Sequence, residues 1–250
     1  MRVFWTLFRR ELASFFLSIT GYVIIAAVTL LIGFGFVVLI TNLGSDSSPM
    51  PLTEVFFNTY CFWWIVILIA PVITMRLFAL EKFTGTFETL MTTPVGDFQV
   101  VAAKFGAAVM FYMVTWLPML ACLFVIRHYT NQPNTLDAGM IGGTYLGIFM
   151  VGSLFLSLGC FASSLTKSQM AAAIVSFVLS VGLFYVGYLA DAIETPAGWQ
   201  AQVLSCFGFF KQMDDFARGV VDLRTMIFYT SLTLFFLFLT LRVVESRRWK

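Results

Sequence analysis

The chain has 250 residues and a net charge of +2, and its composition is 60% apolar and only 11% charged. Soluble domains average about 45–50% apolar and about 25% charged residues, so an ordinary soluble globular protein is excluded. The 29 Phe and 12 Met residues are also unusual for a soluble domain, and the composition as a whole indicates an integral membrane protein.

Residues 1–16 predict an amphipathic helix that lies in the membrane interface before the first long apolar run. Its polar side holds Arg2, Arg9, Arg10 and Glu11. Its apolar side holds Val3, Phe4, Leu7, Phe8, Leu12 and Phe15. We expect this helix to rest in the inner leaflet and to lead directly into the first membrane span.

Six runs with few or no charges are long enough to cross a bilayer, which takes roughly 20 helical residues. They cover residues 17–40, 55–75, 105–126, 138–166, 168–190 and 225–241. Pro71 and Pro118 are expected to kink the second and third of these helices. The predicted fold is therefore a single all-α integral membrane domain over residues 1–250, with six transmembrane helices and both termini on one side.

The distribution of charge predicts which side that is. With both termini inside, the inner segments hold 11 of the 15 basic residues and the outer segments hold eight of the 13 acidic residues. Basic residues accumulate in cytoplasmic segments of membrane proteins. We therefore expect a multi-pass membrane protein with both termini in the cytoplasm.

Residues 77–92, between the second and third spans, predict a short amphipathic helix on the cytoplasmic side. Glu81 and Glu88 stack on one face, with Thr84 close by. The spacing places apolar side chains together on another face: Leu80, Phe83, Phe87, Leu90 and Met91. Periodicity alone leaves two interpretations open, namely a helix that docks onto another protein and a helix that lies on the membrane with Phe83 and Phe87 in lipid.

Small residues in the fourth span indicate a close approach between helices. Gly143 and Gly147 form a G-x-x-x-G pattern, and Gly159 with Ser163 continues the spacing of small residues. The pattern is compatible with packing inside the subunit and with a seam between two subunits.

The segment 191–222, which precedes the sixth span, is too apolar for a free loop and too short and charged to span the membrane. We expect one or two helices that lie in the outer leaflet or re-enter it. Phe207, Phe209 and Phe210 form a dense aromatic cluster within this segment.

No catalytic, cofactor or metal site is predicted. The interiors of the six runs lack ionisable residues, which argues against coupling to an ion gradient. The chain has no G-x-x-x-x-G-K-[ST] phosphate loop and no Cys/His cluster with metal-ligand spacing. We therefore expect no enzyme activity in this chain and no nucleic-acid partner, so that another subunit supplies the energy for any work.

The residues between the second and third spans resemble a signature of ABC-2-type transporter permeases. The matching positions are Arg76, Glu81, Gly85, Thr86, Glu88, Leu90 and Pro94. Arg10 to Leu12 and Phe216 to Asp222 are also similar to that family. Together with Glu245 to Trp249 they resemble its branch of gliding-motility-associated and nitrous-oxide-reductase-maturation permeases.

This resemblance implies a half-transporter of the bacterial plasma (inner) membrane, in which two six-helix subunits, identical or paralogous, each engage a cytoplasmic ABC ATPase. It also implies that residues 77–92 are the coupling helix, and that outer-leaflet helices gate the exit side. The residues expected to dock the ATPase are Glu81, Phe83, Thr84, Gly85, Thr86, Phe87 and Glu88. Phe207, Phe209 and Phe210 are the expected outer gate, with burial against the subunit's own spans as the alternative.

The predicted function is that of a permease subunit of an ATP-binding cassette exporter, which moves a hydrophobic or lipid-linked cargo outward. The alternative is a scaffold or mechanotransmission subunit that carries ATPase motion to a periplasmic partner without translocating anything. Uncharged spans are compatible with both. Membrane lipids are expected partners in either case.

Overall fold

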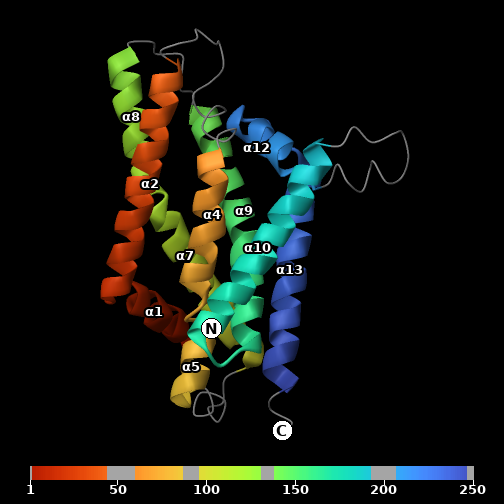
Figure 1. Ribbon diagram of the computed structural model, residues 1–250. Coiled ribbons are helices and arrows are strands. Elements are labelled where there is room, and N and C mark those ends of the chain that lie inside the picture. The colour runs from red at the N-terminus through yellow and green to blue at the C-terminus, as the bar shows by residue number, and fades with distance from the viewer. Residues whose placement is uncertain (1, 44–59, 87–95, 131–137, 193–206, 247–250) are drawn as a thin grey trace, which may run out of the picture.

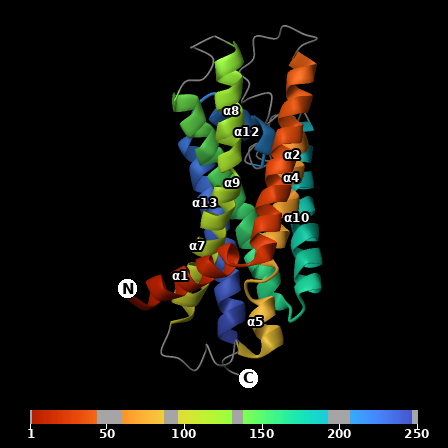
Figure 2. The same cartoon turned by 90° about the vertical axis from the view of Figure 1, so that its left-hand side faces the viewer.

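The computed structural model describes residues 2–43, 60–86, 96–130, 138–192 and 207–246, and this part of the chain is helical without a strand. The helices are α1 Arg2–Phe16, α2 Ile19–Leu43, α4 Tyr60–Thr74, α5 Ala79–Thr84, α7 Asp97–Thr115, α8 Leu117–Thr130, α9 Ala138–Leu165, α10 Gln169–Ala192, α12 Phe209–Ala217 and α13 Leu223–Ser246. The long helices run side by side in an elongated bundle (Figures 1 and 2).

Six helical segments within the described residues are long and apolar enough to cross a membrane. They cover 19–38, 62–84, 97–125, 139–165, 169–190 and 223–246. The prediction of six helices able to cross a membrane is thereby confirmed, and residues 55–59 of the predicted second span lie outside the described residues. Both α1 and the last turn of α13 lie at the end of the bundle that carries α5, so the first and last described helices reach the same side (Figure 1). We call this the α5 end, and the opposite end the α12 end.

Helix α9 is the centre of the bundle. It packs against α4, α7, α10, α12 and α13. Of the window that defines each span, 78% is buried for α9 and only 22% for α10 and for α13. The small residues of α9 account for this position, because they let neighbouring helices approach its backbone.

The third span is interrupted where the sequence predicts a kink. Helix α7 ends at Thr115, and α8 begins at Leu117, directly before Pro118. Proline cannot donate a backbone hydrogen bond, and its ring crowds the preceding turn. Pro71 behaves differently, because it lies inside α4 without ending that helix.

The third span also begins earlier than its apolar run suggests. The predicted span starts at Phe105, whereas α7 starts at Asp97 and places Lys104 two turns inside the helix. Val100, Val101 and Ala103 are buried on the same stretch. The predicted third run, 105–126, left Lys104 outside the span, in a cytoplasmic connecting segment. That assignment is wrong, and the reason is a set of charge partners from other helices, described below.

Helix α1 lies across the bundle at the α5 end rather than along it (Figures 1 and 2). It packs mainly against α7, where the rings of Phe15 and Phe111 stack with centroids 4.8 Å apart. Trp5 and Leu17 stay exposed. The structure thus gives a helix where an interfacial one is predicted, and its place in the inner leaflet stays a prediction.

Helix α12 lies across the opposite end of the bundle, against α9 and α10 (Figure 1). Phe209, Met213 and Phe216 are buried on one side of this short helix. Its amphipathic character matches the prediction of a helix that does not span the membrane. Residues 193–206 of the predicted outer segment lie outside the described residues.

Candidate functional site

The first turn of α5 is fixed by a side chain from another helix. The backbone N–H groups of Phe78 and Ala79 donate to Oγ of Ser163 on α9, at 3.1 and 3.2 Å. The first N–H groups of a helix have no partner within it, and Phe78 at the N-cap position has no oxygen to supply one. Ser163, fully buried, satisfies two of them at once.

The side of α5 that faces the bundle holds it to α9 as well. Phe78 and Ala79 are fully buried there. The amino group of Lys82 donates to the backbone carbonyl of Ser164, one residue after the capping serine. The end of α9 therefore sets both the position and the direction of α5.

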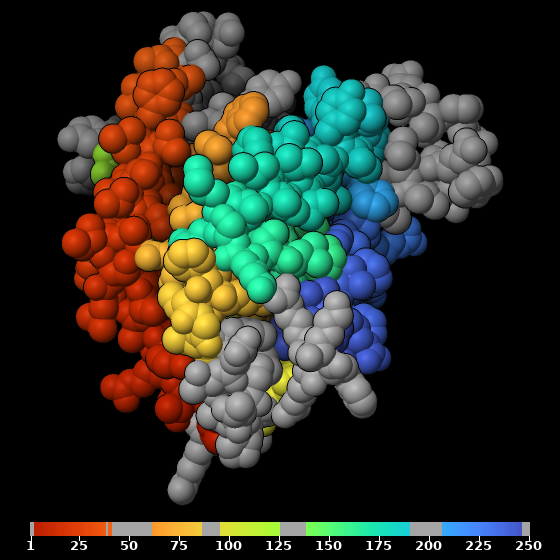
Figure 3. Space-filling view, turned by 60° about the horizontal axis from the view of Figure 1, so that its bottom comes forward, coloured from red at the N-terminus to blue at the C-terminus, as the bar shows by residue number. Residues whose placement is uncertain are grey.

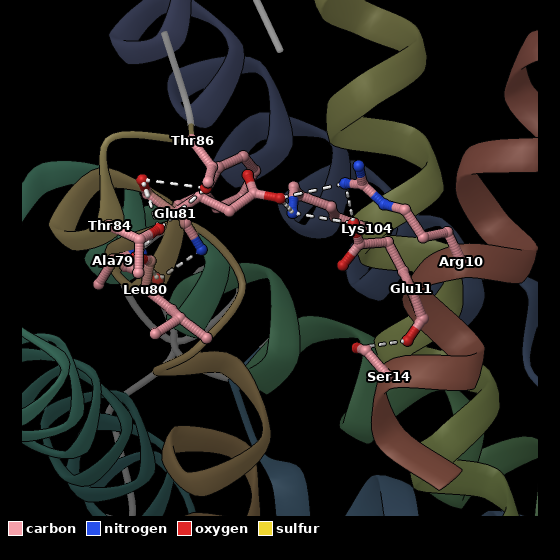
Figure 4. A network of polar contacts seen from close by, with 11 residues as sticks. Arg10, Glu11, Ser14, Ala79, Leu80, Glu81, Thr84, Thr86 and Lys104 are labelled. Atoms are coloured by element: carbon pink, nitrogen blue, oxygen red, sulfur yellow. Dashed lines mark hydrogen bonds and ion pairs between the residues drawn. The ribbon is translucent and has the colours of Figure 1, made fainter. Parts of the chain in front are cut away.

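A network of four charged side chains joins α5 to α1 and α7 (Figure 4). Nζ of Lys104 on α7 lies 2.9 Å from Oε1 of Glu81 on α5 and 3.2 Å from Oε1 of Glu11 on α1. Nη2 of Arg10 bridges the same two oxygens, at 3.1 Å from Glu81 and 2.7 Å from Glu11. Two cations and two carboxylates thus alternate, and the network is neutral as a whole. We call Arg10, Glu11, Glu81 and Lys104 the charge network.

Lys104 is the most enclosed member of the charge network, with 2% of its side chain exposed. An unpaired ammonium at such a place carries a large desolvation penalty. The two carboxylates offset that penalty, and the ring of Phe78, whose centroid is 5.6 Å from Nζ, adds a cation–π contact. The network explains why a lysine is tolerated two turns inside a span.

Arg10 is half-exposed at the rim of the network. Its hydrogen bond to Glu11 is the largest influence on its guanidinium, and burial opposes that influence only in part. Together with the charges of Glu11 and Glu81, this bond raises the pKa of Arg10 above its ordinary value. Arg10 therefore stays a permanent cation between the two carboxylates.

A fifth charged residue connects the segment between α4 and α5 to the start of α2. Nη1 of Arg76 donates to Oγ of Ser18 at 3.4 Å and to Oγ1 of Thr20. Arg76 thus secures the chain between α4 and α5 against the turn between α1 and α2.

These residues surround a cleft of about 400 Å³ between α1, α5 and α7. Its polar wall is formed by the charge network with Arg76, and its apolar wall by Phe15, Leu77 and Leu80. Oε2 of Glu81 is buried without a hydrogen-bond partner. The cleft therefore combines a cationic wall with one carboxylate oxygen that lacks a donor.

The predicted docking residues fall into two groups. Glu81 points inward to Lys104 and Arg10, whereas Phe83, Thr84, Gly85 and Thr86 are exposed at the α5 end. The ring of Phe83 is 74% exposed. Phe87 and Glu88 lie outside the described residues, as does the remainder of the predicted coupling helix up to residue 92.

Gly85 closes α5 in a left-handed conformation, with φ of 74°. Glycine adopts this conformation without the steric cost that a Cβ atom imposes. The hydroxyl groups of Thr84 and Thr86, on either side, lie 2.9 Å apart and within reach of α5 carbonyls. The exposed tip of α5 is thus a defined local structure. Figure 3 shows the bundle turned so that the α5 end comes forward, with α5 in gold beside the red of the N-terminal helices.

The residues predicted as an outer gate are packed against the spans of the subunit. Phe209 is 1% exposed and stacks with Trp63 and Tyr229, at 6.2 and 6.0 Å between ring centroids. Phe210 is half-buried against Trp63, and Phe207 is half-buried in contact with a ring of α13. Burial does not exclude a role as a gate, so the gate stays a prediction. The alternative, packing against the subunit's own spans, has structural support.

The three glycines predicted to mediate packing each face a neighbour within the subunit. A Cβ atom at Gly143 would lie 2.5 Å from the carbonyl oxygen of Phe216, and one at Gly147 would lie 2.9 Å from Met213. A Cβ atom at Gly159 would lie 2.0 Å from Oγ1 of Thr74 on α4. All three approaches occur inside one subunit, and they hold α12 and α4 against α9.

Sequence reasoning missed the charge network. It assigned Arg10 and Glu11 to a polar helix face, Lys104 to a loop and Glu81 to a partner protein, whereas the four residues bind one another. The available signal was the apolar stretch from Val100 to Ala103, which indicates that the helix continues through Lys104 and that the lysine needs a partner.

The described residues give no indication of metal chemistry, since no three His, Cys, Asp or Glu side chains among them are close enough to hold an ion. Cys122 and Cys160 are free thiols in this part of the chain. The site consists of the exposed residues 83–86 and of the contacts that attach α5 to α9, α1 and α7.

Comparison with known proteins identifies a family for the chain. A family model described as ABC-2 family transporter protein matches residues 54–240, about three quarters of the chain. No curated protein matches the sequence.

Proposed function

Because the chain belongs to the ABC-2 family of transporter membrane proteins, we propose that it is the permease subunit of an ATP-binding cassette exporter whose ATPase docks on α5. Family membership implies an ATP-binding partner and a paired membrane subunit. The observation that supports docking on α5 is the division of this helix into an exposed tip, residues 83–86, and an inner face that is secured to three other helices. The resemblance to the gliding-motility and nitrous-oxide-reductase branch stays a prediction.

The exposed tip has the chemistry of a docking surface. An aromatic ring that is 74% exposed at the polar end of a membrane protein forgoes the burial that an aromatic residue normally gains. Aromatic anchors are frequent among the residues that contribute most to binding at protein interfaces. In the proposed complex, Phe83 inserts into the ATPase, and Gly85 permits a close approach between the two backbones.

The inner face offers a route for motion. Ser163 and Ser164 hold α5 to α9, and the charge network holds it to α1 and α7. A displacement of α5 therefore has to move these helices together, since slippage would break buried polar contacts. We propose that closure of the ATPase shifts α5 and that α9, the most buried span, carries the shift toward the α12 end.

The proposed cargo is hydrophobic or lipid-linked. Lys104, buried in a span, is neutralised by Glu11 and Glu81 and lies near one end of the bundle. A cargo with little charge is the kind that the uncharged middle of the spans accommodates. ATP hydrolysis is assigned to the separate subunit, since the chain carries no phosphate loop.

One observation favours the second function, mechanotransmission to a partner outside the membrane. Helix α12 is held tightly to α9 through Gly143 and Gly147, so movement of α9 reaches α12 directly. The two functions differ in what stimulates ATP hydrolysis. A hydrophobic cargo in reconstituted liposomes stimulates an exporter, whereas a motion-transmitting subunit requires its partner from the far side of the membrane.

The orientation is tested with single cysteines in a cysteine-free background. Cysteines at Thr84 and Ser246 are expected to be protected from a membrane-impermeant thiol reagent in intact cells, because the α5 end is proposed to be cytoplasmic. Cysteines at Ser47 and Thr195 are expected to react, and all four should react after the membrane is permeabilised. Labelling at Thr84 in intact cells would contradict both the orientation and the docking on α5.

The docking is tested by removing the aromatic side chains of the proposed anchor. Phe83→Ala combined with Phe87→Ala is expected to weaken association with the ATPase by about 2–4 kcal/mol, roughly 30-fold or more, because these contacts lie between proteins. Co-purification of the ATPase and the melting temperature of the membrane subunit are measured together. We expect the first to fall and the second to stay unchanged.

The matched control is Phe98→Ala, at the start of α7. Phe98 is 70% exposed, similar to Phe83, and lies near the same end of the bundle but outside α5. We expect this variant to retain the ATPase. Equal retention by all variants would instead support the interpretation in which Phe83 and Phe87 rest in lipid.

A further inference from the structure

The cleft between α1, α5 and α7 lies at one end of the bundle of candidate membrane spans, where exposed residues have the character of a membrane interface. Helix α1 crosses the bundle at this level and exposes Trp5, a residue type that concentrates at membrane interfaces. Leu17 and Ile19, beside the turn into α2, are more than 80% exposed. The cleft of about 400 Å³ thus adjoins an apolar surface on one side and the polar α5 end on the other.

The polar wall of the cleft carries a net positive charge. Arg10, Arg76 and Lys104 contribute three positive charges, and Glu11 and Glu81 contribute two negative ones, which leaves +1. The hydrogen bonds of Arg76 use Nη1, and those of Arg10 use Nη2. Each guanidinium therefore keeps donors for a ligand, in the planar arrangement that suits phosphate oxygens.

The same wall presents an acceptor that lacks a donor. Oε1 of Glu81 forms ion pairs with both Lys104 and Arg10, whereas Oε2 is buried without a hydrogen-bond partner. A buried carboxylate oxygen without a hydrogen bond is costly, and such an atom in a cleft is commonly satisfied by a ligand or by water. A ligand for this cleft therefore has an anionic end for the arginines and a donor for Glu81.

We propose that the cleft binds the headgroup of a membrane phospholipid whose phosphodiester carries a hydrogen-bond donor at its far end. The phosphate binds Arg76 and Arg10, and the terminal ammonium or hydroxyl group donates to Oε2 of Glu81. Phosphatidylethanolamine and phosphatidylglycerol both have this chemistry. Phosphatidylcholine has the same phosphate but a quaternary ammonium without a donor, so it is the discriminating lipid.

A lipid in this place links α1 to α5 alongside the charge network. The headgroup joins Arg10 on α1 to Glu81 on α5 and to Arg76, which precedes α5 in the chain. The lipid content of the membrane would then tune how firmly α5 is held. The binding site itself does not depend on the proposed ATPase docking, which the Phe83 and Phe87 variants test separately.

The experiment measures lipid binding to the purified full-length chain by native mass spectrometry, with each of the three lipids added at matched concentrations. Phosphatidylethanolamine and phosphatidylglycerol are expected to remain bound, and phosphatidylcholine to bind about tenfold more weakly because Glu81 finds no donor. Equal retention of phosphatidylcholine would overturn the role of the donor and with it the proposal.

Two variants test the site. Arg76→Gln removes the phosphate contact and is expected to weaken binding roughly tenfold. Leu80→Trp fills the cleft without changing its charge and is expected to abolish binding, so it serves where Arg76→Gln fails to fold. Arg242→Gln is the matched control, because Arg242 is exposed and pairs with Glu245 near the same end, outside the cleft. Unchanged binding by a folded Leu80→Trp protein would overturn the proposal.

Soluble glycerophosphoethanolamine distinguishes a lipid from a free solute. The isolated headgroup is expected to compete weakly, because the acyl chains hold the lipid at the mouth of the cleft. Competition at the same concentration as the intact lipid would assign the cleft to a soluble phosphodiester and overturn the lipid assignment.

Discussion

Replacing Lys104 with methionine is expected to destabilise the subunit by about 3–5 kcal/mol, because Glu11 and Glu81 would then face each other with Arg10 as the remaining cation of the charge network. Methionine keeps most of the volume of the lysine stem, so the effect is electrostatic rather than a cavity. The measurement is thermal unfolding of the purified subunit in detergent. Because α5 loses its attachment to α7, we also expect weaker coupling between ATP hydrolysis and transport in any protein that folds.

Two comparisons separate this result from the ordinary effect of losing a charge. Arg242→Met removes an arginine that is paired at 3.0 Å with Glu245 on an exposed surface, and it is expected to cost less than about 1 kcal/mol. Lys104→Met combined with Glu81→Gln restores the charge balance and should recover part of the lost stability. If Lys104→Met melts like Arg242→Met, the charge network contributes little to the fold.

Replacing Phe209 with alanine is expected to lower the stability of the subunit by about 3–5 kcal/mol. The ring fills the space between Trp63, Tyr229 and the backbone of Gly187, where a Cβ atom on the glycine would lie 2.3 Å from it. A large, enclosed ring leaves a cavity that the surrounding helices cannot close without strain. The melting temperature and the yield of the intact subunit measure the effect.

Phe210→Ala is the informative counterpart, because Phe210 is only half-buried, against Trp63, Phe184 and Tyr188. We expect a smaller loss of stability. If Phe210→Ala melts normally, retains the ATPase and still loses transport, the aromatic cluster acts as a gate. A fall in stability at both positions with transport preserved in the folded fraction would leave packing as the role of the cluster. Phe235→Ala on the exposed side of α13 controls for the loss of a surface ring.

The number and location of the spans could be predicted from the sequence because each depends on a local property. A run of about 20 apolar residues has few alternatives to a membrane helix, whatever the remainder of the chain does. The break at Pro118 is local in the same sense. Helix α1 also follows from its own periodicity, which requires no knowledge of its neighbours.

The charge network could not be predicted in this way, because it joins residues 11, 81 and 104 from three separate helices. Locally, Glu81 has the features of a surface glutamate in an amphipathic helix, and Lys104 those of a basic residue at the edge of an apolar run. Only the crossing of α1 over α7 brings their partners within 3.2 Å. A periodic pattern indicates which residues share a face, but it does not indicate what that face contacts.

The glycines of α9 illustrate a similar limit. Their spacing indicates a close approach of some helix, and the structure identifies the neighbours as α12 for Gly143 and Gly147 and α4 for Gly159. Two different neighbours along one helix were not evident from a single repeated pattern. Packing against α12 also explains how so short a helix is held in place at the end of the bundle.

Because Ser163 of α9 caps α5, the residues that hold this helix in place differ from those proposed to recognise the ATPase. A six-residue helix is too short to be stable alone, and it usually needs its own residues for caps and contacts. Here α9 supplies the N-terminal cap, and Glu81 and Lys82 supply the attachments to the bundle, so Phe83, Thr84 and Thr86 contribute little to holding the helix in place. Phe83, Thr84 and Thr86 are therefore free to diverge between duplicated genes without a loss of fold, whereas position 85 needs glycine for its left-handed backbone. Transplanting them from one permease to another is therefore a direct way to redirect a subunit to a different ATPase.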